Sequence, residues 1–174
     1  MVRDHGRMQL NGNPGAPRMR LLLDSNVIIA AEPFAGDLEE NLEVAALLLR
    51  LANEQGHYLC VAAATRDDLL QGQDATRRRQ RLAELAKFSQ LAEVPVSDDL
   101  RERAGDSPRG SNDERDLRIL AALDAGAATH LVNDDARLLR RAAKAGLGEL
   151  ALTTQAHATC CGGSLPRSWH PLRA

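Results

Sequence analysis

The chain has 174 residues, which is enough for one domain with a hydrophobic core and short tails. Hydrophobic residues make up 44% and aromatic residues only 2%, which favours helix-rich α/β packing and argues against an aromatic surface for stacking RNA bases. The formal net charge of -2 provides no global basic field, so nucleic acid would need local arginine clusters.

The three cysteines fit neither a disulfide framework nor a zinc site, because Cys60 stands alone and Cys160 and Cys161 are adjacent. A reducing cytoplasm is the simplest compartment for such a chain. No stretch is long and apolar enough to span a bilayer, and the N-terminus lacks the apolar core of a signal peptide, so we expect no membrane partner.

Short apolar strands alternate with amphipathic helices along the chain. Residues 1–18 carry Gly, Pro and Arg without periodicity, and we expect a disordered leader. The run MRLLL (19–23) is apolar on both faces, as a central parallel strand is, and it ends at Asp24. A helix capped by Asp37 and ending near Gly56 follows.

A second strand is predicted over 58–61. The helix after it begins around Arg66 and carries the adjacent acids Asp67 and Asp68, so acidic residues again follow an apolar strand.

The middle of the chain has a longer helical pattern. Residues 74–90 continue as a helix with Leu82, Leu85 and Phe88 facing inward and the arginines of the 77–81 run facing outward. LAEVPV (91–96) can form an edge strand, since its proline has no N–H to donate to a ladder.

A loop over 104–112 precedes the next helix. Ser111 and Glu114 have the spacing of a capping box and mark the start of that helix. Asp113 and Asp116 are three residues apart and therefore share one face of its first turns.

A short apolar run at 129–132 is too short for a helix and predicts a strand, and an amphipathic helix begins after the polar residues 133–135. The last strand is predicted over 149–152, and Thr153 can cap a final turn. We expect a weakly ordered tail over 159–174.

The alternation predicts one α/β domain over 19–158, built on a mostly parallel sheet of four or five strands. Right-handed crossovers place the carboxyl ends of parallel strands at one edge, where ligands usually bind. The acids that we expect to converge there are Asp24, Asp67 or Asp68, Asp113 or Asp116, and Asp134 or Asp135.

Converging carboxylates repel one another unless a cation neutralises them. Oxygen ligands without His or Cys suit Mg²⁺ or Mn²⁺, and such an ion can activate water and stabilise a leaving oxygen in phosphodiester hydrolysis. The glycine loops that cradle nucleotide phosphates are absent from the sequence.

Four segments resemble, in the same order, the acidic motifs of PIN-domain ribonucleases, and the similarity covers roughly residues 20–155. This resemblance implies a PIN-like three-layer α/β/α sandwich around a central, mostly parallel sheet. The segments are LLLDSNVIIA (21–30), ATRDDLL (64–70), DLRILAALDAG (116–126) and HLVNDDARLLRRA (130–142).

Carried over residue by residue, the resemblance assigns catalytic, metal-binding and supporting roles. The catalytic acids are Asp24, Asp68, Asp116 and Asp135, of which Asp24, Asp116 and Asp135 also bind metal; supporting residues are Asn26, Asp67, Asp113, Asn133 and Asp134. The second acid is Asp where the family commonly has Glu, which leaves Asp67 and Asp68 as alternatives. Asn133 stands where the family usually has Thr or Ser.

The resemblance implies an endoribonuclease dependent on Mg²⁺ or Mn²⁺, often a homodimer, and in bacteria often the toxin partner of an antitoxin protein. Two alternatives stay open. One is a PIN-like module that binds RNA or protein without cleavage, and the other is a different Mg²⁺-dependent phosphotransfer or phosphatase enzyme on a similar sheet.

The same residues also have plainer explanations. Asp24, Asp134 and Asp135 stand where helices begin, and an Asp there commonly caps the helix. Asp116 lies a turn deeper in its helix, where the helix dipole explains less. The cationic candidates for RNA binding are explained just as well by solvated helix faces; they are Arg137, Arg140, Arg141 and the arginines of the 77–81 run.

Overall fold

The computed structural model describes residues 18–31, 42–71 and 74–160. The predicted Asp37 cap lies outside these residues. So do the expected leader, apart from Arg18, and the expected tail, apart from the two residues that end the last helix.

A five-stranded, all-parallel sheet forms the centre of the fold, as predicted. The strand order is β3-β2-β1-β4-β5, so the first strand lies in the middle. The strands are β1 (Arg20–Leu23), β2 (Tyr58–Val61), β3 (Ser89–Gln90), β4 (His130–Val132) and β5 (Ala151–Leu152).

Helices connect the strands and cover both faces of the sheet. Within the described ranges they are α1 (Ser25–Ala30), α2 (Leu42–Glu54), α3 (Ala63–Leu69), α4 (Ala75–Leu85), α5 (Asp98–Ala104), α6 (Asn112–Asp124), α7 (Ala136–Lys144), the 3-10 turn η1 (Gly148–Leu150) and α8 (Thr154–Cys160). None of these helices is long and apolar enough to cross a membrane.

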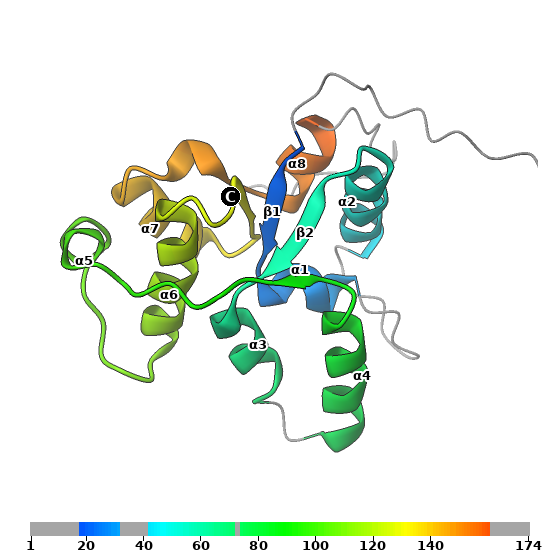
Figure 1. The fold of residues 1–174 in the computed structure, drawn as a ribbon, viewed down its shortest axis with the longest axis horizontal. Coiled ribbons are helices and arrows are strands. Elements are labelled where there is room, and N and C mark those ends of the chain that lie inside the picture. The colour runs from blue at the N-terminus through cyan, green and yellow to red at the C-terminus, as the bar shows by residue number, and fades with distance from the viewer. Residues whose placement is uncertain (1–17, 32–41, 72–73, 161–174) are drawn as a thin grey trace, which may run out of the picture.

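The alternating side chains of β1 divide the core into two layers. Leu22 packs with buried residues of α5, α6 and α7, whereas Leu21 and Leu23 pack with buried residues of α1, α2 and α8. Figure 1 shows α6 and α7 on one side of the strands and α2 and α8 on the other. The result is a three-layer α/β/α sandwich, in which an uninterrupted apolar strand such as β1 is buried on both faces.

Two predictions for the middle of the chain are wrong. α4 ends at Leu85, and Leu82 is 44% exposed because α4 lies at the margin of the fold and buries little besides Leu85. The edge strand is Ser89–Gln90, which pairs with β2, whereas residues 91–96 form no strand. Phe88, as predicted, packs against the core.

A helix before the predicted loop was not foreseen. α5 is capped by Ser97, whose hydroxyl accepts a hydrogen bond from the Leu100 N–H at 3.1 Å. Leu100 is buried against α6 and anchors this short helix to the core. Ser97-Asp98-Asp99 is a cap followed by first-turn acids, so the signal was present in the sequence.

The carboxyl ends of the strands form the edge on which the predicted acids converge. β1 continues into Asp24, whose N–H donates to the Val132 carbonyl at 3.1 Å, and Asn133 in turn donates to the Leu152 carbonyl at 3.1 Å. The chain runs from β1 outward to β3 on one side and then crosses to β4 on the other. A topological switch point therefore lies between β1 and β4, where Asp24 and the residues after Val132 meet.

Three histidines gather at the opposite edge of the sheet. His57 precedes β2, His130 opens β4 beside Leu21, and His157 lies on α8, which packs on the same face. The rings of His130 and His157 meet edge to face with their centroids 5.3 Å apart. Burial lowers the pKa of all three, that of His157 to about 4, and the mutual repulsion of the imidazoles adds to the effect at His57 and His157.

Acid should therefore destabilise the fold through His157. Its folded pKa lies below the value near 6.5 expected in the unfolded chain, so the unfolded state binds the proton more readily. We expect the free energy of unfolding to fall as the pH drops from about 6.5 towards 4, with up to about 3 kcal/mol of the loss due to this residue. Urea unfolding of wild type and His157→Gln across this pH range measures the difference. Equal pH slopes in the two proteins would contradict the expectation.

Candidate active site

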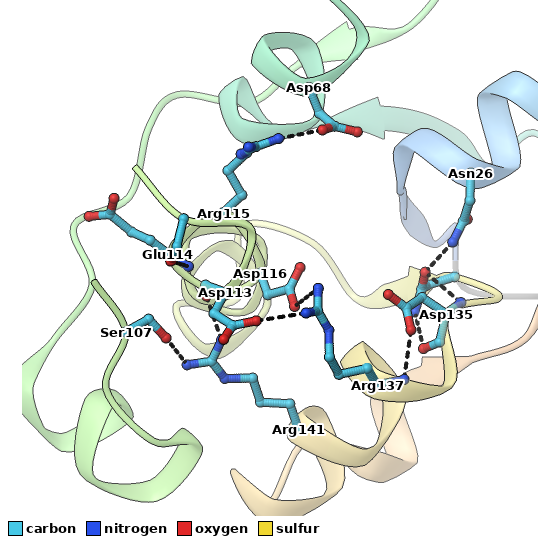
Figure 2. Close-up of polar contacts among 12 residues, drawn as sticks. Asn26, Asp68, Ser107, Asp113, Glu114, Arg115, Asp116, Asp135, Arg137 and Arg141 are labelled. Carbon is cyan, nitrogen blue, oxygen red and sulfur yellow. Dashed lines mark hydrogen bonds and ion pairs between the residues drawn. The ribbon is translucent and has the colours of Figure 1, made fainter. Parts of the chain in front are cut away.

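A hollow of about 280 Å³ opens at the carboxyl ends of β1 and β4. Four of the predicted acids line it, and each comes from a different segment: the end of β1, α3, α6 and the start of α7. Figure 2 shows three of these carboxylates arranged around one open space. The lining residues are Asp24, Ser25, Asn26, Asp68, Asn112, Arg115, Asp116, Asp135 and Arg137.

Asp24 is the most buried of the four acids, with only 8% of its surface exposed. Its burial raises the pKa of the carboxyl to about 7. The Ser25 N–H counteracts the shift, while the charges of Asp116, Asp68 and Asp135 add to it. The site therefore disfavours the charged form of Asp24, and a nearby cation would favour its ionised form.

Asp116 has an acceptor that the protein leaves unsatisfied. Its Oδ2 is buried and accepts no hydrogen bond from any described residue. The guanidinium of Arg137 lies 3.4 Å away, an ion-pair distance without hydrogen-bond geometry. Burial raises the pKa of Asp116, although the charge of Arg137 opposes the shift.

The start of α6 fixes where Asp116 lies. The Ser111 hydroxyl accepts from the Glu114 N–H at 3.1 Å, as the capping-box spacing predicts. Glu114 returns its carboxylate to the Gly110 N–H rather than to that of Ser111. With its first turn anchored in this way, α6 directs Asp116 from its second turn into the hollow.

Asn133 connects the segments that carry the first and fourth acids. Its side-chain oxygen accepts from Asn26 Nδ2 at 2.6 Å and from the Asp135 N–H at 3.0 Å, and its own Nδ2 donates to the Asp135 carbonyl at 3.0 Å. Asp135 also caps α7 by accepting from the Arg137 N–H at 2.7 Å. The buried Asn133 thus holds two loops together through contacts that a Thr or Ser hydroxyl could make only in part.

The geometry distinguishes the two adjacent acids of α3. Asp68 lines the hollow and contacts Arg115. Asp67 is exposed outside the hollow and pairs with Arg118 at 3.2 Å. Asp68 is therefore the acid of α3 that belongs to the candidate site.

The other predicted residues surround the hollow or hold its walls. Asp113 pairs with Arg137 at 2.9 Å beside the lining residues. Both oxygens of Asp134 hold the start of α8, since they accept from the N–H and hydroxyl of Thr154 at 2.9 and 2.6 Å. Arg140 is exposed on α7.

Arg141 anchors the loop before α6. Its guanidinium donates to the carbonyls of Ala104, Gly105 and Asp113 and to the Ser107 hydroxyl, a network that Figure 2 shows in part. Arg141, which was predicted to bind RNA, therefore uses its guanidinium to hold this part of the fold.

Three further residues line the hollow that were not predicted from the sequence, namely Ser25, Asn112 and Arg115. Ser25 and Asn112 are the first residues of α1 and α6, so their neighbouring acids could have indicated them. Arg115 gave no comparable signal, because its place depends on how α6 packs against α3.

The donor set of the hollow fits a hard divalent cation. Carboxylate oxygens face one space, Asp116 keeps an unsatisfied buried oxygen, and burial together with the neighbouring acids raises the pKa of Asp24. Across the described ranges, no three His, Cys, Asp or Glu side chains approach closely enough to form a ready metal site. Ion pairing with Arg115 and Arg137 draws Asp68 and Asp116 towards those arginines instead.

Comparisons with family models, curated proteins and solved structures gave no match for this chain. The similarity of four short motifs to PIN-domain ribonucleases therefore stays a hypothesis, and the geometry of the hollow has to support any function by itself.

Replacing Asp24 with Asn should stabilise the protein at alkaline pH. The folded pKa near 7 exceeds the unfolded value of 3.8, so the stability of wild type falls as the pH rises through this window. At pH 8 without divalent ions we expect Asp24→Asn to unfold at a higher urea concentration, with a gain of up to about 4 kcal/mol, and near pH 4 we expect little difference. Asp67→Asn is the control outside the hollow. A destabilised Asp24→Asn protein at pH 8 would contradict the prediction.

Proposed function

We propose that the protein is an endoribonuclease that hydrolyses RNA phosphodiester bonds with Mg²⁺ or Mn²⁺. The observation that carries the proposal is the meeting of Asp24, Asp68, Asp116 and Asp135 in one hollow at the switch point of a parallel sheet. The resemblance of the motifs around these acids to PIN-domain ribonucleases supports the choice of substrate.

The four acids have two roles in this proposal. Asp24, Asp116 and Asp135 would hold the ion, and Asp68 would complete the negative field on the α3 side. A bound divalent ion would supply the charge that stabilises the negative charge developing on the phosphate and on the leaving oxygen, and it would favour the ionised form of water. The chain itself positions the carboxylates, through the Asn133 network and the capped start of α6.

RNA is the macromolecular partner that the proposal requires. Arg137 lines the hollow and Arg140 is exposed on the same helix, so both can meet a phosphate backbone. A homodimer, an antitoxin partner and a toxin role rest on the resemblance alone, and the proposal does not depend on them.

A non-cleaving RNA-binding module is the second candidate. Its support is that Arg115 and Arg137 already neutralise Asp68 and Asp116, so the described site has internal cations where an enzyme of this kind needs a metal ion. Incubation of purified protein with end-labelled RNA, with Mn²⁺ or with EDTA, separates the candidates. Cleavage only with Mn²⁺ supports the enzyme, whereas RNA binding that is independent of metal and leaves the RNA intact supports the module.

Asp116→Asn should abolish Mn²⁺-dependent RNA cleavage while leaving the fold intact. The substitution removes one negative charge from the hollow and keeps the size of the side chain, so we expect the rate to fall on the order of 100-fold or more. Asp124→Asn is the matched control, because Asp124 lies at the other end of α6 and pairs with Arg103 at 2.9 Å. Unchanged cleavage by Asp116→Asn, with contaminating nuclease excluded, would refute the proposed function.

A further inference from the structure

The hollow contains two guanidinium groups in addition to its four carboxylates. Arg115 approaches from α6 and Arg137 from the first turn of α7, and Figure 2 shows both beside the open space. Arg115 contacts Asp68, and Arg137 lies between Asp116 at 3.4 Å and Asp113 at 2.9 Å. Both arginines are therefore paired with acids in and beside the proposed metal site.

The charges of the lining residues match one divalent cation. The four carboxylates, when ionised, carry -4 and the two guanidinium groups carry +2, which leaves -2. A divalent ion held by Asp24, Asp116 and Asp135 would compete with Arg137 for the oxygens of Asp116, and its positive charge would repel both guanidinium groups. Arg137 would keep only its pair with Asp113, and both arginines would lie next to an ion that itself attracts anions.

We propose that Arg115 and Arg137 form an anion-binding subsite for a phosphodiester, and that they exchange their carboxylate partners for its oxygens when a divalent ion binds. The phosphodiester as ligand rests on the proposed function. The planar guanidinium fork presents paired N–H groups that match the oxygens of a phosphate as well as those of a carboxylate. The exchange would therefore provide both arginines with hydrogen-bond acceptors.

Arg118, which also lies on α6, provides a comparison, because it contacts α3 outside the hollow. Arg118 lies one turn after Arg115 and also bridges to α3, where it pairs with Asp67 at 3.2 Å; it pairs in addition with Glu93, in the segment after β3, at 2.7 Å. Arg118 lies outside the hollow, whereas Arg115 lines it with 18% of its side chain exposed. The ion pair between Arg118 and Asp67 already joins α6 to α3 outside the hollow. A second arginine placed inside the hollow is therefore not needed for that purpose alone.

The exchange predicts opposite effects on the two ligands. Removing the Arg115 charge frees Asp68 and makes the hollow more negative, so a cation should bind more tightly. The same change removes a donor to phosphate, so RNA should bind more weakly. A structural arginine would affect both ligands in the same direction or neither of them.

The test compares Arg115→Gln with Arg118→Gln in the full chain, after circular dichroism has shown that both are folded. Free Mn²⁺ is measured by electron paramagnetic resonance without RNA. Binding of a fluorescein-labelled octaribonucleotide is measured by anisotropy in Ca²⁺, and the integrity of the RNA is checked on a gel.

For Arg115→Gln we expect Mn²⁺ affinity to rise about threefold and RNA affinity to fall about tenfold. For Arg118→Gln we expect neither value to change by more than about twofold.

Arg137→Gln should shift both affinities in the same directions as Arg115→Gln, since its guanidinium pairs with Asp116. Arg115→Lys should have the Mn²⁺ affinity of wild type and an RNA affinity between those of wild type and Arg115→Gln, because the substitution keeps the charge but removes the planar fork.

The outcomes separate this inference from the proposed function. RNA that is not cleaved when wild type is supplied with Mn²⁺, and that binds more weakly to Arg115→Gln in Ca²⁺, refutes the enzyme but supports the subsite. RNA that is cleaved, with unchanged affinity for Arg115→Gln, supports the enzyme and overturns the subsite. Equal loss of RNA binding in Arg115→Gln and Arg118→Gln, or no RNA binding by wild type, also overturns it.

Discussion

The buried carboxyl of Asp24 is the constraint on which the site depends. It follows the central strand directly, its N–H extends the ladder to β4, and only 8% of its surface is exposed. An acid in this position is costly, because burial and three neighbouring carboxylates both disfavour its charge. The surrounding residues can be understood as the means by which the protein tolerates this negative charge without a metal ion.

Two kinds of contact stabilise the negatively charged hollow. Arginines from α6 and α7 neutralise the outer acids Asp68 and Asp116, while backbone N–H groups and the Asn133 amide hold the loops on which Asp24 and Asp135 lie. The raised pKa of Asp24 is opposed by the Ser25 N–H, and none of the causes of the shift is a cationic side chain. The innermost position is therefore the one where an added cation would relieve the most repulsion.

The sequence predicted the architecture well because the signals were local. MRLLL, apolar on both faces, could only be a central strand, and the Ser111 to Glu114 spacing located the start of α6 within one residue. The position of the acids at strand ends followed from parallel topology. Local signals failed at α4 and at 91–96, where little burial enforces the pattern, and Leu82 is exposed for that reason.

The details of the site depended on tertiary packing and could not be inferred in the same way. Asp67 and Asp68 are adjacent on one helix, and only the contact of α3 with α6 directs Asp68 to the hollow. The same contact brings Arg115 into the site. Arg141, although it belongs to the same basic helix as Arg137, is held by carbonyls of a loop whose path the sequence did not reveal.

The two hydrogen bonds from Thr154 to Asp134 have a consequence for how the chain folds during its synthesis. Asp134 lies directly before the fourth acid, yet both of its oxygens accept hydrogen bonds from a residue twenty positions later, at the start of α8. α8 also packs along α2, so it joins an early and a late part of the chain. A nascent chain on the ribosome can form β1, β2 and β4 before these donors emerge, and the loop that carries Asp135 gains this support only after Thr154 has been synthesised.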